Sequence, residues 1–254
     1  MRPAIGAAVR HMAASALVAV VAAGLVFGLW YPEPYAALAG GITLFGLMVA
    51  VDVICGPVLT LVVFDRRKPH RELACDIGII VALQLAALAY GLYSVAQARP
   101  IFLAYEGNRF RVVSMADVHS SKLSNALPEF GVPGYTGPRL IGVKLIDASD
   151  PGYRESIMLS MEGLPPAFRP ERWTSYQSLL PQLQAALLPI TSLKQKHSDA
   201  AAAAIDAALL REGLNEETAG YLPLDAAKAD PLNWVVIVDR AFGQPKAFLP
   251  LDGW

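Results

Sequence analysis

The chain has 254 residues and is strongly apolar: 54% of its residues are hydrophobic and 17% are charged, against about 45–50% and about 25% in soluble proteins. Its formal net charge of −1 gives no bulk electrostatic argument for binding nucleic acid or another polyanion. The two cysteines, Cys55 and Cys75, lie in or beside apolar segments, which excludes a disulfide-stapled scaffold and a cysteine-based metal site. Each is expected to be a small buried residue.

Three apolar stretches reach the roughly 20 residues that a helix needs to cross a bilayer core. They run from about Met12 to Trp30, from about Ala36 to Phe64 and from about Ile77 to Ala96. Backbone groups in lipid must bond to one another, so each stretch is predicted to be a helix. The predicted organisation is a three-helix transmembrane bundle over residues 1–96, followed by a mixed α+β periplasmic domain over residues 97–254.

Lysine and arginine placement predicts the orientation. Basic residues precede the first stretch and follow the second, whereas the loop Tyr31–Tyr35 has none; the basic residues are Arg2, Arg10, Arg66, Arg67, Lys68 and Arg71. Basic loops stay in the cytoplasm, so the N-terminus is expected there and everything after Ala96 on the far side. A cleaved signal peptide ending near Ala37–Ala39 is the alternative for the first stretch, but cleavage there would cut into the second.

Residues 101–105 and 110–113 flank a short turn containing Gly107, which predicts a β-hairpin. Residues 119–138 are rich in Ser, Pro and Gly and predict a loop, and Leu140–Ile146 predicts a strand. Further along, Pro170–Leu188 has helical spacing, with Pro181 expected to bend or split the helix.

A second soluble helix is predicted from the Ser198-Asp199 cap through Arg211, ended by Gly213. Trp234–Val238 and Ala247–Leu251 predict a second hairpin. Strands that come first and last around central helices favour a mixed α+β domain whose terminal strands share one sheet.

Asp52 is the most unusual residue, because it lies near the middle of the second stretch, where a charge costs about 2.5–3.5 kcal/mol. Two interpretations stay open: a site for a partner helix or an ion path, or a protonated carboxyl bonded inside the bundle. Gln84 lies at a similar depth in the third stretch. Three helices are few for a transporter, so the partner is the favoured functional interpretation.

Gly56-Pro57 follows one turn later, and proline there is expected to kink the helix, either to shape a groove beside Asp52 or only for packing. Gly24 and Gly28 form a GxxxG pattern in the first stretch, continued by Ser15, Ala19 and Ala23, which suits close helix contact but is common in membranes.

The soluble region contains no recognised catalytic motif, so no enzyme activity, cofactor or metal is expected. His119 and His197 lack metal-ligand spacing. Asp147, Asp150 and Glu155 are interpreted as a solvated turn.

Four stretches occur in a characteristic order: Leu29–Pro32 (LWYP), Val51–Phe64 (VDVICGPVLTLVVF), Leu83–Tyr93 (LQLAALAYGLY) and Gln97–Pro100 (QARP). Together they resemble the type IV pilin accessory proteins of the TfpX/TfpZ group. The likeness covers the membrane third well, and the remainder matches only in layout.

The resemblance implies a multi-pass protein of a bacterial inner membrane that acts as a chaperone-like factor for a cognate type IV pilin. The expected partners are the lipid bilayer and the pilin, which is contacted through its transmembrane helix and has its head as a second candidate contact. No nucleic acid is expected. The residues expected to bind the pilin helix are Asp52, Gly56 and Pro57, supported by Gln84. The alternative function is a membrane-anchored receptor whose periplasmic domain binds a ligand; cytoplasmic loops of about a dozen residues are too short for an output domain.

Overall fold

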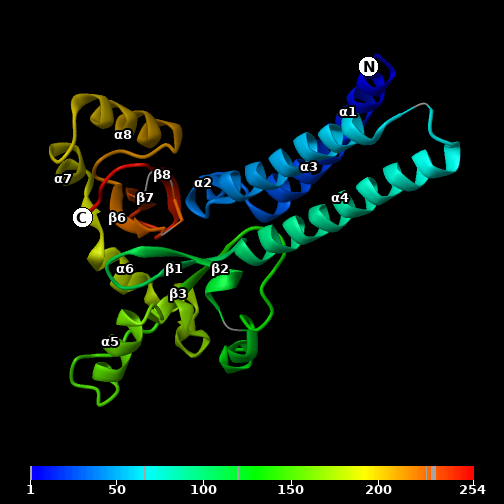
Figure 1. The fold of residues 1–254 in the computed structure, drawn as a ribbon. Coiled ribbons are helices and arrows are strands. Elements are labelled where there is room, and N and C mark those ends of the chain that lie inside the picture. Colours follow the sequence, from blue (N-terminus) through cyan, green and yellow to red (C-terminus); the bar gives the residue numbers. More distant parts are fainter. Residues whose placement is uncertain (1, 66, 119, 227, 230–232) are drawn as a thin grey trace. The chain divides into compact units, whose positions relative to one another are not determined.

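The computed structural model describes residues 2–65, 67–118, 120–226, 228–229 and 233–254, so Arg66 and His119 lie outside the described residues. Contacts divide the chain into two compact units. The first contains Met1–Ala36 and Gly40–Arg99, and the second contains Ala37–Ala39 and Pro100–Trp254. The first unit consists of helices and the second is built on a β-sheet (Figure 1).

The helical unit confirms the three predicted membrane helices. Its elements are α1 (Arg2–Leu25), continued by the π-helical turn η1 (Val26–Trp30), α2 (Tyr35–Leu38), α3 (Gly41–Val63) and α4 (His70–Ala98). The segments long and apolar enough to cross a membrane are Ala4–Trp30, Gly41–Val63 and His70–Ala98. The third helix starts before Ile77 because polar residues outside the bilayer core do not prevent a helix from continuing.

In this unit α3 packs against both α1 and α4, while α1 and α4 make few contacts with each other. Most of the surface is apolar: Val20, Leu47 and Val62 are among the exposed side chains, as expected for helices surrounded by lipid. Cys55 and Cys75 are also exposed, so the expectation that they are buried is wrong. They lie on helices whose outward faces have no protein to cover them.

The second unit contains one mixed sheet, and its described strands follow the order β4-β3-β1-β2-β6-β7-β8, with β5 also paired to β6. The strands are β1 (Pro100–Tyr105), β2 (Phe110–Ser114), β3 (Arg139–Val143), β4 (Trp173–Thr174), β5 (Leu188–Pro189), β6 (Ala219–Asp225), β7 (Asn233–Asp239) and β8 (Pro245–Leu249). The pairs β1–β3 and β2–β6 are parallel and the others antiparallel. Both predicted hairpins, β1–β2 and β7–β8, are confirmed and share this sheet.

Two hydrophobic cores cover different parts of the sheet. One core joins β1, β2 and β3 to Phe130, Ala167 and Trp173. The other joins β6, β7 and β8 to α7 (Ile190–Gln195) and α8 (Asp199–Arg211), which lie on one face of those strands (Figure 1). The predicted cap of α8 is confirmed, because the Ser198 side chain accepts a hydrogen bond from the Ala201 N–H.

The single helix predicted over residues 170–188 is wrong. The segment contains η5 (Pro170–Arg172), β4, η6 (Tyr176–Leu179), α6 (Leu180–Ala186) and β5. Pro181 lies in the first turn of α6, where its missing N–H leaves no helical bond unmade. Trp173 belongs to the sheet core through β4, so its helical spacing from later apolar residues reflects burial and not a helix.

Four other segments differ from the predictions. The strand expected to reach Ile146 ends at Val143, and Glu155 belongs to a helix, α5 (Tyr153–Met161), rather than a turn. The predicted loop over 119–138 contains the short η3 (Ser120–Asn125); η2 (Met115–Asp117) and η4 (Pro166–Phe168) are further short turns. Strand β6 was not predicted. It tolerates Pro223 because β5 pairs at Gly220 and Tyr221 and β2 at Leu224 and Asp225, leaving Pro223 between them.

Candidate functional site

Asp52 lies at the centre of α3, with eleven residues of the helix on either side. It lines a groove of about 180 Å³ formed by α1, α3 and α4. Because α1 and α4 make few contacts with each other, α3 forms the floor of this groove and the other two helices form its walls. The polar residues among the lining side chains are His11, Ser15, Asp52 and Gln84.

Gln84 connects α4 to the floor of the groove. Its Nε2 donates a 2.9 Å hydrogen bond to the backbone carbonyl oxygen of Asp52. The orientation of the amide follows, because only its nitrogen can donate to a carbonyl. Gly56 makes this approach possible, since a Cβ at that position would overlap the Gln84 amide. The predicted glycine and glutamine are therefore the two sides of one contact between helices.

Substituting Gly56 with alanine is expected to break the Gln84–Asp52 bond without unfolding the protein, because the end of a glutamine can rotate away. The bond is worth about 0.6 kcal/mol in a membrane bundle. The Gly78→Ala variant is the matched control, because nothing lies within 4 Å of a Cβ there, and it measures the gain in helix propensity alone. Thermal unfolding in detergent should show that Gly56→Ala and Gln84→Ala are not additive. Additive losses would contradict the contact.

A second polar contact holds the C-terminal end of α3 to α1. His11 Nδ1 and Thr60 Oγ1 are 2.6 Å apart. Thr60, Gly56 and Pro57 are all buried along α3. Pro57 has no N–H to donate to the carbonyl of Val53, yet α3 continues to Val63. Sequence reasoning missed this contact, although a polar residue near the start of α1 and one near the end of α3 meet naturally in an antiparallel helix pair.

The structure thus separates the four predicted site residues into two pairs. Asp52 and Gln84 line the groove, whereas Gly56 and Pro57 are buried in the bundle and do not line it. From the small-residue pattern of α1, Ser15 and Ala19 line the groove. Gly24 and Gly28 would have open space around an added Cβ, so they make no close helix contact in this unit.

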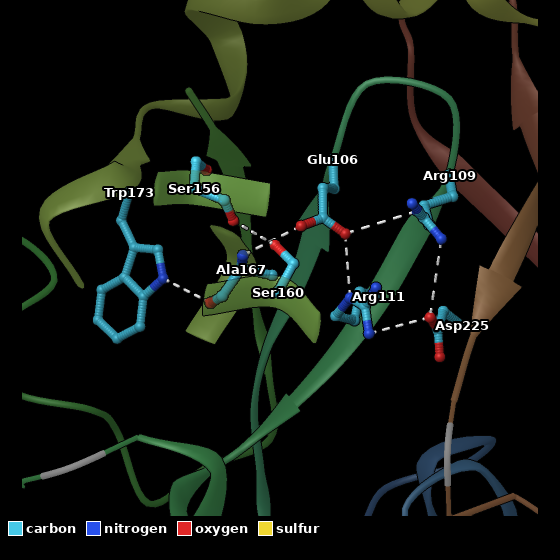
Figure 2. Close-up of polar contacts among 8 residues, drawn as sticks. All are labelled: Glu106, Arg109, Arg111, Ser156, Ser160, Ala167, Trp173 and Asp225. Atoms are coloured by element: carbon cyan, nitrogen blue, oxygen red, sulfur yellow. Dashed lines mark hydrogen bonds and ion pairs between the residues drawn. The ribbon is translucent and has the colours of Figure 1, made fainter. Parts of the chain in front are cut away.

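A second polar cluster lies in the sheet unit and was not predicted (Figure 2). Glu106 Oε2 is 3.0 Å from Arg111 Nε and 3.6 Å from Arg109 Nε, and Glu106 Oε1 accepts a hydrogen bond from the Ala167 N–H at 3.2 Å. Arg111 Nη1 is 2.9 Å from Asp225 Oδ2. Only 4% of the Glu106 side chain is exposed. Nothing about the turn position of Glu106 indicated that its side chain would be buried.

This cluster joins two halves of the sheet. The β2–β6 pairing that connects them registers only Phe110 with Leu224 and Arg111 with Asp225. The two carboxylates are balanced by the two guanidinium groups, so no charge is left over for a ligand. We therefore assign the cluster a structural role.

The remaining histidine and acidic residues singled out in the sequence do not form a binding site among the described residues. The described residues contain no group of three or more His, Cys, Asp or Glu that could hold a metal ion. His197 Nε2 lies 2.8 Å from the backbone carbonyl oxygen of Asp252. Asp147 and Asp150 accept hydrogen bonds from the N–H groups of Ser149 and Gly152, which is the local turn chemistry expected of them.

The fold and the groove define a membrane-anchored protein with three candidate spanning helices and a mixed α/β domain. Residues 1–40 match the family described as Fimbrial assembly protein FimB. The fimbrial assembly protein of serogroup I from Dichelobacter nodosus is 34% identical over 230 residues, covering 91% of this chain and 88% of the relative. The serogroup E1 protein of that organism is 33% identical with the same coverage. No solved structure matches this chain.

The chain therefore belongs to the fimbrial assembly protein family. A third relative, from serogroups C1 and C2 of Dichelobacter nodosus, is 37% identical over 116 residues, covering 46% of this chain and 88% of the relative. The expectation of a protein involved in pilus assembly is confirmed. These matches identify the fimbrial assembly protein family, and they do not support the narrower assignment to the TfpX/TfpZ group.

Proposed function

We propose that this protein is a chaperone-like accessory factor that holds a cognate type IV pilin in the membrane and assists its stability or assembly. The observation that carries the proposal is the groove along α3, with Asp52 at its centre, in a member of the fimbrial assembly protein family. A groove at membrane depth can accept a polypeptide only as a helix, because its backbone groups need internal partners. A membrane-embedded pilin supplies such a helix.

Within this proposal the four predicted residues act in two ways. Asp52 and Gln84 contact the pilin helix directly, since both line the groove. Gly56 and Pro57 act indirectly, by setting where α3 lies against its neighbours. The protein acts by binding, and the proposed role requires no catalytic step or cofactor. The head of the pilin is a further candidate contact for the second unit.

We place the protein in a bacterial inner membrane with its N-terminus in the cytoplasm and its 97–254 domain in the periplasm. The basic residues support this orientation, since Arg67, Lys68 and Arg71 fall between α3 and the apolar part of α4 while the loop Tyr31–Tyr35 has none. The domain boundary between residues 96 and 97 belongs to the same proposal.

Deleting the gene is the direct test. We expect many fewer pili per cell by electron microscopy, with pilin transcript unchanged and the pilin protein less stable. A plasmid-borne copy restores piliation, whereas a copy truncated after residue 96 reveals whether the second unit is needed. Normal piliation in the deletion strain would overturn the proposal.

A further inference from the structure

The groove contains one carboxylate without a partner among the contacts described. In the part of the chain that the structure describes, the Asp52 carboxylate forms no hydrogen bond or ion pair, although it lies at the centre of an apolar helix. The Gln84 NH₂ group uses one of its two N–H donors on the Asp52 backbone carbonyl, and neither this bond nor any other described contact reaches the Asp52 carboxylate.

The other polar side chains of the groove do not supply a partner for this carboxylate. The His11 ring is engaged with Thr60 near the far end of α3. Ser15 belongs to the α1 wall, and no bond between its hydroxyl and Asp52 occurs among the described contacts. A polar group in lipid without a partner is costly, so an occupant that brings donors to this point is favoured over one that does not.

The walls of the groove suit a helix. Ala14, Ser15 and Ala19 give α1 a small-residue face toward the groove, and such faces let a second helix approach closely. A lipid acyl chain would fill the apolar parts but carries no donor for Asp52. A second copy of this chain brings no lysine or arginine to that depth, because the stretches 12–30, 41–63 and 77–96 contain none.

We infer that the groove binds one transmembrane helix of a different protein, and that this helix presents a basic donor, such as an amine or a guanidinium, to Asp52. The inference deepens the proposed function and rests on it for the view that the groove is a partner site. It adds the chemistry of the partner: a donor at the depth of Asp52, and a small or smooth face toward α1.

Photocrosslinking in living cells tests the inference. A photoreactive residue at Val49, which lines the groove, is compared with one at Val62, whose side chain is 78% exposed on the same helix. We expect Val49 alone to capture a single partner, with the crosslinked peptide, mapped by mass spectrometry, lying within about one helical turn of a donor.

The identity of the captured helix separates the two claims. Pilin with a donor at that depth supports both. Another membrane protein with such a donor supports the inference and overturns the proposed pilin function. A helix without a donor there, a second copy of this chain, or lipid alone would overturn the inference.

Variants of Asp52 give a second readout of the same contact. Asp52→Leu should lower the crosslinking yield from Val49 by about tenfold, the loss expected when a hydrogen bond to a charged group is removed. Asp52→Asn should retain an intermediate yield, because it keeps one acceptor. Leucine favours membrane insertion, so equal amounts of each variant in the membrane are expected. An unchanged yield with Asp52→Leu would contradict the inference.

Discussion

Replacing Glu106 with alanine should lower the free energy of unfolding of the sheet unit by about 3–5 kcal/mol, the usual cost of removing one partner from a buried ion pair. The loss is large because the Glu106 carboxylate contacts Arg111, Arg109 and the Ala167 N–H from a position that is almost fully buried. The Arg111 side chain is only 14% exposed, so its guanidinium would lose the Glu106 carboxylate and be left with Asp225 as its carboxylate partner. Denaturant unfolding of the protein in detergent, followed by fluorescence of the buried Trp173, measures the change.

Asp206→Ala is the matched control. Asp206 also pairs with a cation, Lys194, but its side chain is 60% exposed, and exposed ion pairs contribute about 0–1 kcal/mol. Glu106→Gln should fall between these two, because an amide oxygen can still accept from the Ala167 N–H. If Glu106→Ala were no more costly than Asp206→Ala, the cluster would not hold the two halves of the sheet together.

Replacing Tyr31 with alanine should cost about 3–5 kcal/mol, as for other buried aromatic residues truncated to alanine. Tyr31 is fully buried, and it connects the three long helices at one end of the helical unit. It follows α1, its hydroxyl donates a 2.9 Å hydrogen bond to the carbonyl of Val95 in α4, and its ring occupies the space that a Cβ at Gly41 of α3 would need. Burial raises the pKa of Tyr31 above its usual value, so the hydroxyl remains a donor at physiological pH.

Thermal unfolding of the purified protein in detergent tests this prediction. Tyr90→Ala serves as the control, since Tyr90 is 73% exposed on α4. Tyr31→Phe should cost only about 1 kcal/mol, because it removes the hydrogen bond but keeps the ring. The same loss from Tyr31→Ala and Tyr90→Ala would show that Tyr31 does not fix the helices. If the loss is as large as expected, Tyr31→Ala should also reduce crosslinking from Val49, since the groove depends on the placement of α1 and α4.

The elements with strong local signals were predicted well. The three membrane helices follow from apolar length alone, and the hairpins β1–β2 and β7–β8 follow from strand residues around short turns. The helix α8 follows from its Ser198 cap and alanine-rich body. Each of these signals lies within about 20 consecutive residues, where chain geometry leaves few alternatives.

The failures have a common cause, which is contact between segments far apart in the chain. Residues 170–188 looked helical because their apolar residues have helical spacing, but Trp173 pairs with Val143 of β3 and so belongs to the sheet. Strand β6 was missed because Pro223 argues against a strand, and only the placement of β5 and β2 along one side of β6 makes it tolerable. Glu106 looked like an ordinary turn residue until Arg111 and Ala167 were brought to it.

The candidate site shows the same division. By itself the sequence determined that the chain has three membrane-spanning helices, that Asp52 lies in the middle of one, and that Gly56, Pro57 and Gln84 are unusual at similar depths. Only the tertiary structure decided that Gln84 reaches the backbone of Asp52 through the space left by Gly56, and that α1 and α4 stand apart over α3. The reason is physical: bilayer crossing depends on local hydrophobicity, whereas a groove depends on which faces of separate helices meet.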